Sequence, residues 1–182
     1  NRGLSGIALT TQADSVLDTD VDIVVELLGG DEPAGTLVRR ALERGIPVVT
    51  ANKALLAAHA DELFALAYRH HTRIYFEAAV GGGLPIVRTL REGLAGDRVL
   101  EVCGILNGTC NFVLGRMEKG EAYDVAVQKA QALGFAEADP TTDVSGRDTA
   151  DKLAILARLA FGLSVPSTDI ATTGISELTP EV

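Results

Sequence analysis

Three short apolar runs in the first half of the chain alternate with helical patterns, and this alternation limits the fold more than any other feature. The runs at 21–26 and 46–50 are rich in valine and isoleucine, and the run at 73–77 holds isoleucine, tyrosine and phenylalanine, as strands do. Helical patterns occupy the intervening segments 33–44 and 54–70. Strand–helix–strand repeats at this spacing make right-handed crossovers and place the strands parallel in one sheet. We therefore predict an α/β fold that begins with part of a Rossmann-type parallel sheet.

The composition changes after Glu77, where a glycine-rich segment follows the third predicted strand. Beyond it, residues 98–106 are predicted to form a strand, and residues 107–117 and 121–133 are predicted to form helices. We therefore expect an α+β second part, with one sheet covered by helices. The predicted domains are a partial dinucleotide-binding domain at 1–77 and a substrate-binding, catalytic and dimerisation domain at 78–182.

The net charge limits the kinds of partner that the protein can bind, and the cysteine content indicates its cellular compartment. The 182 residues carry a formal net charge of −9, which disfavours a nucleic acid or an anionic membrane as partner. No apolar run is long enough to span a bilayer. Cys103 and Cys110 lack metal-ligand spacing and are typical of reduced cytosolic thiols. We expect a cytoplasmic protein that binds a small molecule.

The stretch 134–152 concentrates several carboxylates before a lysine and an apolar helix at 153–161. Asp148 and Lys152 are four residues apart, so they are neighbours if both lie in that helix. One interpretation is an exposed acidic loop with a surface ion pair that contributes only about 0.3–0.5 kcal/mol. The other is a polar substrate site, in which carboxylates hold an ammonium and a hydroxyl group while a lysine handles a proton.

The order of residues in this stretch resembles the signature of the homoserine dehydrogenase family. The similarity extends over essentially the whole chain, including the segments 21–30, 50–53, 77–85 and 107–109. Members of the family carry a glycine-rich cofactor motif upstream and more chain downstream, so we expect this polypeptide to be the middle of such an enzyme. The positions that carry the signature are Ala130, Gly134, Phe135, Asp139, Pro140, Asp143, Gly146, Asp148 and Lys152.

The resemblance implies an oxidoreductase that interconverts L-homoserine and L-aspartate 4-semialdehyde with NAD or NADP, in threonine and methionine biosynthesis. It also implies a homodimer and a bound Na⁺ or K⁺. Lys152 is the expected proton-transfer group and Lys53 the expected group that stabilises the oxyanion. The implied site residues are Lys152, Lys53 and Asp148 for catalysis; Glu137, Asp143, Asn107, Gly108 and Thr109 for substrate; Gly29, Gly30, Asn52 and Lys53 for cofactor; and Glu77, Val80, Gly82 and Leu84 for the cation.

Several of these residues have ordinary structural explanations, which the sequence leaves open. Taken alone, Lys53 is more typical of a solvated lysine at a helix start than of a site residue. Gly29 and Gly30 are equally typical of a strand–helix turn, and Asn107 is typical of a turn. Two other functions also stay open. One is a non-catalytic ligand-binding or oligomerisation domain, and the other is a nicotinamide oxidoreductase acting on another amino acid.

Overall fold

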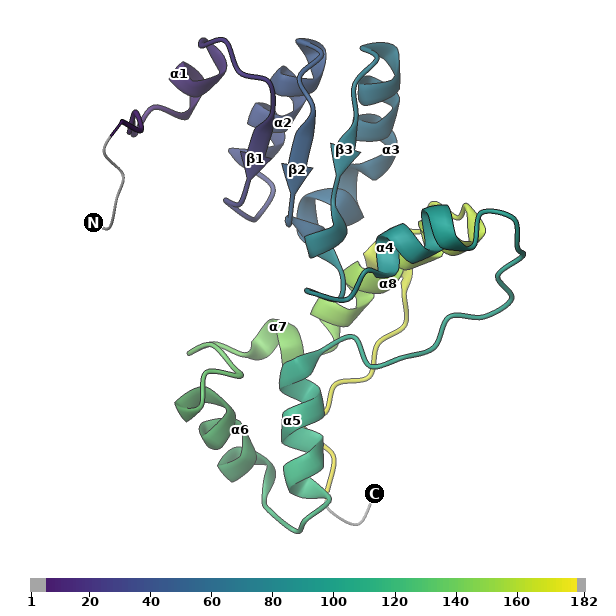
Figure 1. The fold of residues 1–182 in the computed structure, drawn as a ribbon. Coiled ribbons are helices and arrows are strands. Elements are labelled where there is room, and N and C mark those ends of the chain that lie inside the picture. Colours follow the sequence, from purple (N-terminus) through teal and green to yellow (C-terminus); the bar gives the residue numbers. More distant parts are fainter. Residues whose placement is uncertain (1–5, 180–182) are drawn as a thin grey trace.

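A three-stranded parallel sheet carries the first half of the protein. The computed structural model describes residues 6–179, and the sheet consists of β1 (Val24–Glu26), β2 (Val48–Thr50) and β3 (Ile74–Tyr75) in that order. In both ladders the pairing starts at Val48, which lies opposite Val24 on one side and Ile74 on the other. The carboxyl ends of the strands point toward the second half of the chain (Figure 1). The predicted mixed α/β fold with a parallel sheet is confirmed.

Helices α2 (Ala34–Glu43) and α3 (Lys53–Arg69) cover one face of this sheet, and a short α1 (Ala13–Leu17) precedes β1 (Figure 1). Asn52 begins α3 as its N-cap, because its side-chain oxygen accepts a hydrogen bond from the Leu55 amide at 3.1 Å. This cap fixes the start of the helix at Lys53, directly after the carboxyl end of β2.

The second half is helical in the described residues, and α8 is its longest element. In α8 the first turn is polar, so the helix starts six residues before the apolar pattern at 153–161 that indicated it. The elements are η1 (Glu77–Ala79), α4 (Ile86–Arg88), η2 (Thr89–Gly93), α5 (Gly108–Met117), α6 (Tyr123–Ala132), α7 (Thr141–Val144), α8 (Arg147–Phe161) and η3 (Ser167–Asp169).

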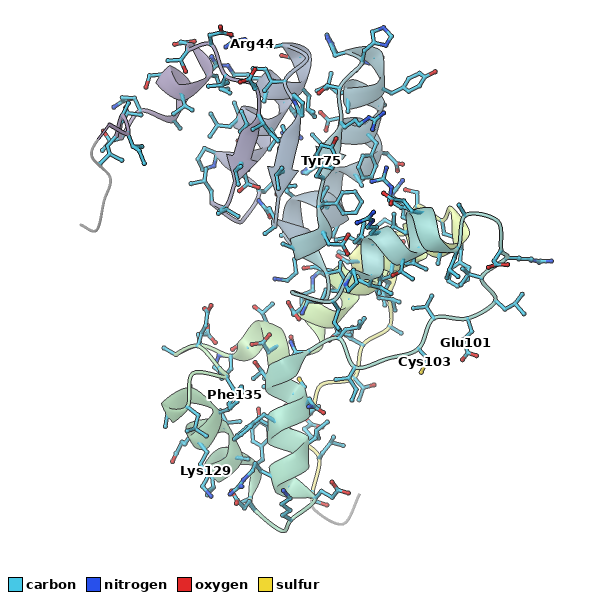
Figure 2. All side chains as sticks on the ribbon, viewed as in Figure 1. Arg44, Tyr75, Glu101, Cys103, Lys129 and Phe135 are labelled. Carbon is cyan, nitrogen blue, oxygen red and sulfur yellow. The ribbon has the colours of Figure 1, made fainter. Side chains whose placement is uncertain are left out.

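The strand expected at 98–106 is not formed, and this prediction was wrong. The segment is instead an extended connection that runs along the outside of the molecule, where Figure 2 shows Glu101 and Cys103 pointing away from it. Leu100 is 81% exposed and Ile105 is 76% exposed. A strand requires a neighbour to complete its hydrogen bonds, and within residues 6–179 no second strand lies beside this segment.

Two hydrophobic cores hold the elements together. The larger one lies between the sheet, α2 and α3, and it also takes in Ile155 and Leu156 from α8. The smaller one joins α5, α6 and the segment around Ile175. Helix α8 therefore packs its apolar face on the sheet half, although it follows α7 in the chain. The division at residue 77 stays a prediction. Within residues 6–179, none of the helices is long and apolar enough to cross a membrane.

A substitution at Leu63 tests the packing of the larger core. It lies on α3 with no exposed surface, whereas Tyr68 on the same helix is 84% exposed. We expect Leu63→Ala to lower the free energy of unfolding by about 2–5 kcal/mol because it leaves a cavity. The matched control Tyr68→Ala should change it by less than about 0.5 kcal/mol. Denaturant unfolding followed by circular dichroism measures both, and equal effects would contradict this packing.

Candidate functional site

Asp148 lies at the centre of the candidate site, between two lysines from different elements. Its Oδ2 atom is 2.6 Å from Nζ of Lys152, one turn along α8, and its Oδ1 atom is 3.1 Å from Nζ of Lys53, the first residue of α3. Only 5% of Asp148 is exposed. The second lysine and the burial distinguish this arrangement from the exposed ion pair that the spacing of Asp148 and Lys152 also allowed.

The start of α8 places Asp148 and Lys152 correctly. Gly146 precedes the helix with φ of +86°, and a Cβ atom there would come within 3.3 Å of the Thr172 side chain. Glycine therefore permits both the backbone conformation and the close approach. Lys152 is further fixed because its Nζ donates to the Leu106 carbonyl at 2.8 Å. This leaves one N–H of the ammonium without an acceptor among residues 6–179.

Asn107 connects the two carboxylates of the site. Its Nδ2 atom donates to Oδ1 of Asp143 at 2.7 Å and to Oδ2 of Asp148 at 2.8 Å. Its Oδ1 atom accepts from the Cys110 amide at 2.8 Å and so caps α5. Both N–H groups and the oxygen of this side-chain amide thus have partners within the protein, so Asn107 holds the acids in place.

The other residues expected around the substrate lie at different distances from this cluster. Thr109 donates its hydroxyl to the Phe135 carbonyl at 2.6 Å, and the same oxygen is 3.2 Å from Oδ2 of Asp143. Gly108 is the first residue of α5, next to Asn107. Glu137 is exposed in the loop after α6, and its side chain makes no hydrogen bond within residues 6–179. The structure does not bring Glu137 into contact with the cluster.

The surroundings of Asp148 favour its charged form. Burial by itself raises the pKa of a carboxyl group, but hydrogen bonds from Lys152, Asn107 and Lys53 outweigh it, so the pKa of Asp148 lies below its ordinary value. Burial raises the pKa of the Cys110 thiol, and the charges of Asp143 and Asp148 act in the same direction. The raised pKa disfavours the thiolate form of Cys110, whose Sγ donates to the Asp143 carbonyl at 3.2 Å.

A turn at the carboxyl end of β1 fits the expected cofactor. Gly29 and Gly30 have φ of +74° and +73°, and a Cβ atom on either would meet nothing within 4 Å. The Asn52 side chain donates to the Gly30 carbonyl at 2.7 Å and ties the turn to the start of α3. An open backbone turn at this edge of a parallel sheet is where ligands bind in such folds. These residues therefore suit a nicotinamide cofactor, next to Lys53.

The glycine-rich segment after η1 is a compact turn. Gly81 and Gly82 have φ of +78° and +59°. The Glu77 carboxylate accepts hydrogen bonds from the Val87 and Arg88 amides, both at 2.9 Å, and so caps α4. The Leu84 carbonyl accepts from the Ile86 amide at 2.8 Å. Across residues 6–179 no three His, Cys, Asp or Glu side chains gather as metal ligands.

Sequence reasoning missed Glu26 and Thr50 as candidate site residues. Both are buried at the carboxyl ends of adjacent strands, and their side chains contact each other beside the Gly29–Gly30 turn. An acid that ends a valine-rich strand, with Gly29 and Gly30 only three and four residues farther on, was the available signal.

The pH dependence of stability tests the surroundings of Asp148. Its ordinary pKa is 3.8, and its lowered folded-state pKa stabilises the fold above the unfolded-state pKa. That contribution is lost as the pH falls through the folded-state pKa. We lower the pH from about 6 to about 3 and compare melting temperatures. The melting temperature should fall by more in the parent protein than in Asp148→Asn. The exposed control Asp20→Asn should follow the parent. Parallel curves for the parent and Asp148→Asn would contradict this assignment.

Comparisons with known proteins give the same family for both halves of the chain. The family model of homoserine dehydrogenase matches residues 85–182, and that of the homoserine dehydrogenase NAD binding domain matches residues 1–77. The homoserine dehydrogenase of Bacillus subtilis is 50% identical over 175 residues, which are 95% of this chain and 40% of that protein.

Solved structures show the same relationship. A homoserine dehydrogenase from Thiobacillus denitrificans matches with a TM-score of 0.93 at 50% identity, over 97% of this chain and 42% of that one. A hyperthermophilic archaeal homoserine dehydrogenase in complex with NADPH matches with a TM-score of 0.83 at 34% identity, over 91% of this chain and 51% of that one. The chain spans about two fifths of the curated relative's length. It belongs to the homoserine dehydrogenase family.

Proposed function

We propose that the full-length protein interconverts L-homoserine and L-aspartate 4-semialdehyde with NAD or NADP. The observation that carries this proposal is the buried Asp148 carboxylate between Lys152 and Lys53, at 2.6 and 3.1 Å. A carboxylate that orients two ammonium groups suits a reaction in which oxyanion charge develops on the substrate. Membership of the homoserine dehydrogenase family gives the reaction class.

The lysines have separate roles in this proposal. In the reductive direction a nicotinamide held at this site would supply the hydride for the aldehyde carbon, and the aldehyde oxygen would become an alkoxide. Lys152 donates a proton from its remaining N–H, because its other contacts are the Asp148 carboxylate and the Leu106 carbonyl. Lys53 places a second positive charge at the same carboxylate and stabilises the alkoxide. In the oxidative direction Lys152 takes the proton back.

The substrate is held by the acids and the N-terminal turn of α5. Asp143 suits the ammonium group of the amino acid, because a carboxylate accepts charge-assisted hydrogen bonds and Asn107 already fixes its position. We assign Glu137 to the same substrate, together with Gly108 and Thr109. Glu137 is exposed, so it is available to a ligand.

The cofactor is assigned to the turn at the carboxyl end of β1. Gly29 and Gly30 offer open backbone, while Asn52 and Lys53 line the start of α3 beside it. The match of the NAD binding domain to residues 1–77 supports a nicotinamide cofactor, with the second, substrate-binding domain at 78–182. We further infer from the family resemblance a cytoplasmic homodimer that serves threonine and methionine biosynthesis.

A Na⁺ or K⁺ site is proposed at Glu77 and the carbonyl groups of Val80, Gly82 and Leu84. The tight backbone turn at Gly81 and Gly82 supports it, because carbonyl oxygens exposed at such a turn are ligands that a hard cation accepts.

Lys152→Ala tests the proton-transfer role. We expect kcat to fall by about 10²–10⁴, the usual contribution of a positioned acid or base, while homoserine still binds. The matched control is Lys129→Ala, which removes an exposed lysine of α6 and should leave kcat unchanged. Homoserine-dependent reduction of NAD and NADP, followed by absorbance of the reduced nicotinamide, gives the rates. Full turnover in Lys152→Ala would assign the proton transfer to Lys53. No turnover in the folded parent with either cofactor would contradict the proposed enzyme function.

The proposed cation site predicts salt-specific activity. NaCl or KCl should raise kcat/KM several-fold over tetramethylammonium chloride at equal ionic strength, because the large organic cation cannot enter a ring of carbonyl groups. The same assay measures this. Identical rates in all three salts would remove the cation from the proposal.

A further inference from the structure

Glu26 is a buried carboxylate that the proposed mechanism does not use. It ends β1 and is 4% exposed, and among residues 6–179 no lysine, arginine or histidine forms an ion pair with it. An uncompensated buried carboxylate is costly unless hydrogen bonds replace its hydration. The hydrogen bonds that Glu26 accepts therefore identify what the carboxylate holds in place.

All of these hydrogen bonds lead to the cofactor turn or to the neighbouring strand. The Oε1 atom of Glu26 accepts from the Leu28 amide at 2.7 Å and from the Gly29 amide at 3.1 Å. The Oε2 atom accepts from the Thr50 hydroxyl at 2.5 Å. The turn itself lies at the surface, since Leu28 is 61% exposed. A buried side chain thus fixes the backbone of an exposed turn.

Thr50 extends this connection to the other end of the turn. Its Oγ1 atom donates to Glu26 and accepts from the Asn52 amide at 2.9 Å. The Asn52 side chain then donates to the Gly30 carbonyl at 2.7 Å. The turn is therefore held at its start by Glu26 and at its end by Asn52, and the Thr50 hydroxyl joins the two.

The same connection reaches the catalytic lysine. Asn52 caps α3 through the Leu55 amide, and Lys53 is the first residue of that helix. The Lys53 ammonium lies 3.1 Å from the Asp148 carboxylate. The positions of the cofactor turn and of Lys53 therefore depend on one set of hydrogen bonds that starts at Glu26.

We propose that Glu26, acting with Thr50, is a positioning residue that holds the nicotinamide-binding turn in register with Lys53. The inference rests on the function proposed above and adds to it the group that aligns cofactor and lysine. A carboxylate suits this role because its three partners are all hydrogen-bond donors. Glutamine would present an NH₂ group to one of them, and a valine or isoleucine would accept from none.

The test uses four single variants of the full-length protein and the double variant of Glu26→Gln and Thr50→Val. Glu26→Gln and Thr50→Val break the connection, whereas Thr50→Ser keeps the hydroxyl. Glu43→Gln changes an exposed acid at the end of α2 and is the matched control. The measurements are the Kd of NADH and NADPH by fluorescence titration without homoserine, the KM values of cofactor and homoserine, kcat, and the melting temperature.

We expect Glu26→Gln and Thr50→Val each to raise the Kd and KM of the cofactor about tenfold, the size of one lost hydrogen bond to a charged group. The KM of homoserine should stay within about twofold, since its proposed ligands are not in this set of hydrogen bonds. Thr50→Ser and Glu43→Gln should match the parent. The double variant of Glu26→Gln and Thr50→Val should have the same cofactor Kd as the single variant with the higher Kd, because both substitutions break the same connection.

Different results would overturn the inference and the proposed function. A parent that turns over homoserine while the variants keep its cofactor Kd and KM overturns the positioning role alone. So does a fall in melting temperature without a change in these constants, which would show a purely structural role. If Glu26→Gln fails to fold, the comparison of Thr50→Val with Thr50→Ser decides. A folded parent that binds neither cofactor overturns both the inference and the proposed function.

Discussion

The contact of one buried carboxylate with two lysines is the interaction on which the rest of the site depends. Taking the Asp148 carboxylate out of water is costly, which offsets much of what its ion pairs contribute to stability. The contact matters more for chemistry than for stability. Two ammonium groups share one carboxylate, which leaves an excess positive charge where an alkoxide would form. Asp143, tied to the same centre through Asn107, adds a negative charge on the side suited to a substrate ammonium.

Most of the sheet half could be predicted from sequence, because its strands are apolar runs and its helices have clear boundaries. The second half was harder for physical reasons. Residues 98–106 have strand-like composition, but a strand exists only with a neighbour, and composition does not show whether one is present. The first turn of α8 carries no apolar pattern because it faces the site, so apolar spacing indicated only the part from Leu153 onward.

The candidate site also has residues that the sequence could predict and residues that it could not. Asp148 and Lys152 could be paired from their spacing alone, since four residues make one helical turn. Lys53 joins them only through the packing of α3 on α8, which the sequence does not state. Asn107 was expected near the substrate, yet its amide proved to be fully used within the protein. Glu26 escaped notice because its partners are mainly backbone amides, and backbone hydrogen bonding leaves no residue pattern.

Helix α8 explains how the two halves of the site keep their alignment. Its apolar face lies in the core of the sheet half, while its polar first turn contacts Asn107 at the start of α5. Near the start of α8, Asp148 contacts Lys53 of α3. Farther along α8, Arg158 pairs with Asp61 of α3, and Ser164 also contacts that acid. Between these two contacts, Ile155 and Leu156 of α8 lie in the same core as Leu63 of α3, so apolar packing and polar contacts together hold the angle between the helices. An exposed ion pair such as Arg158–Asp61 adds little free energy, but it restricts the same angle that places Lys53 beside Asp148.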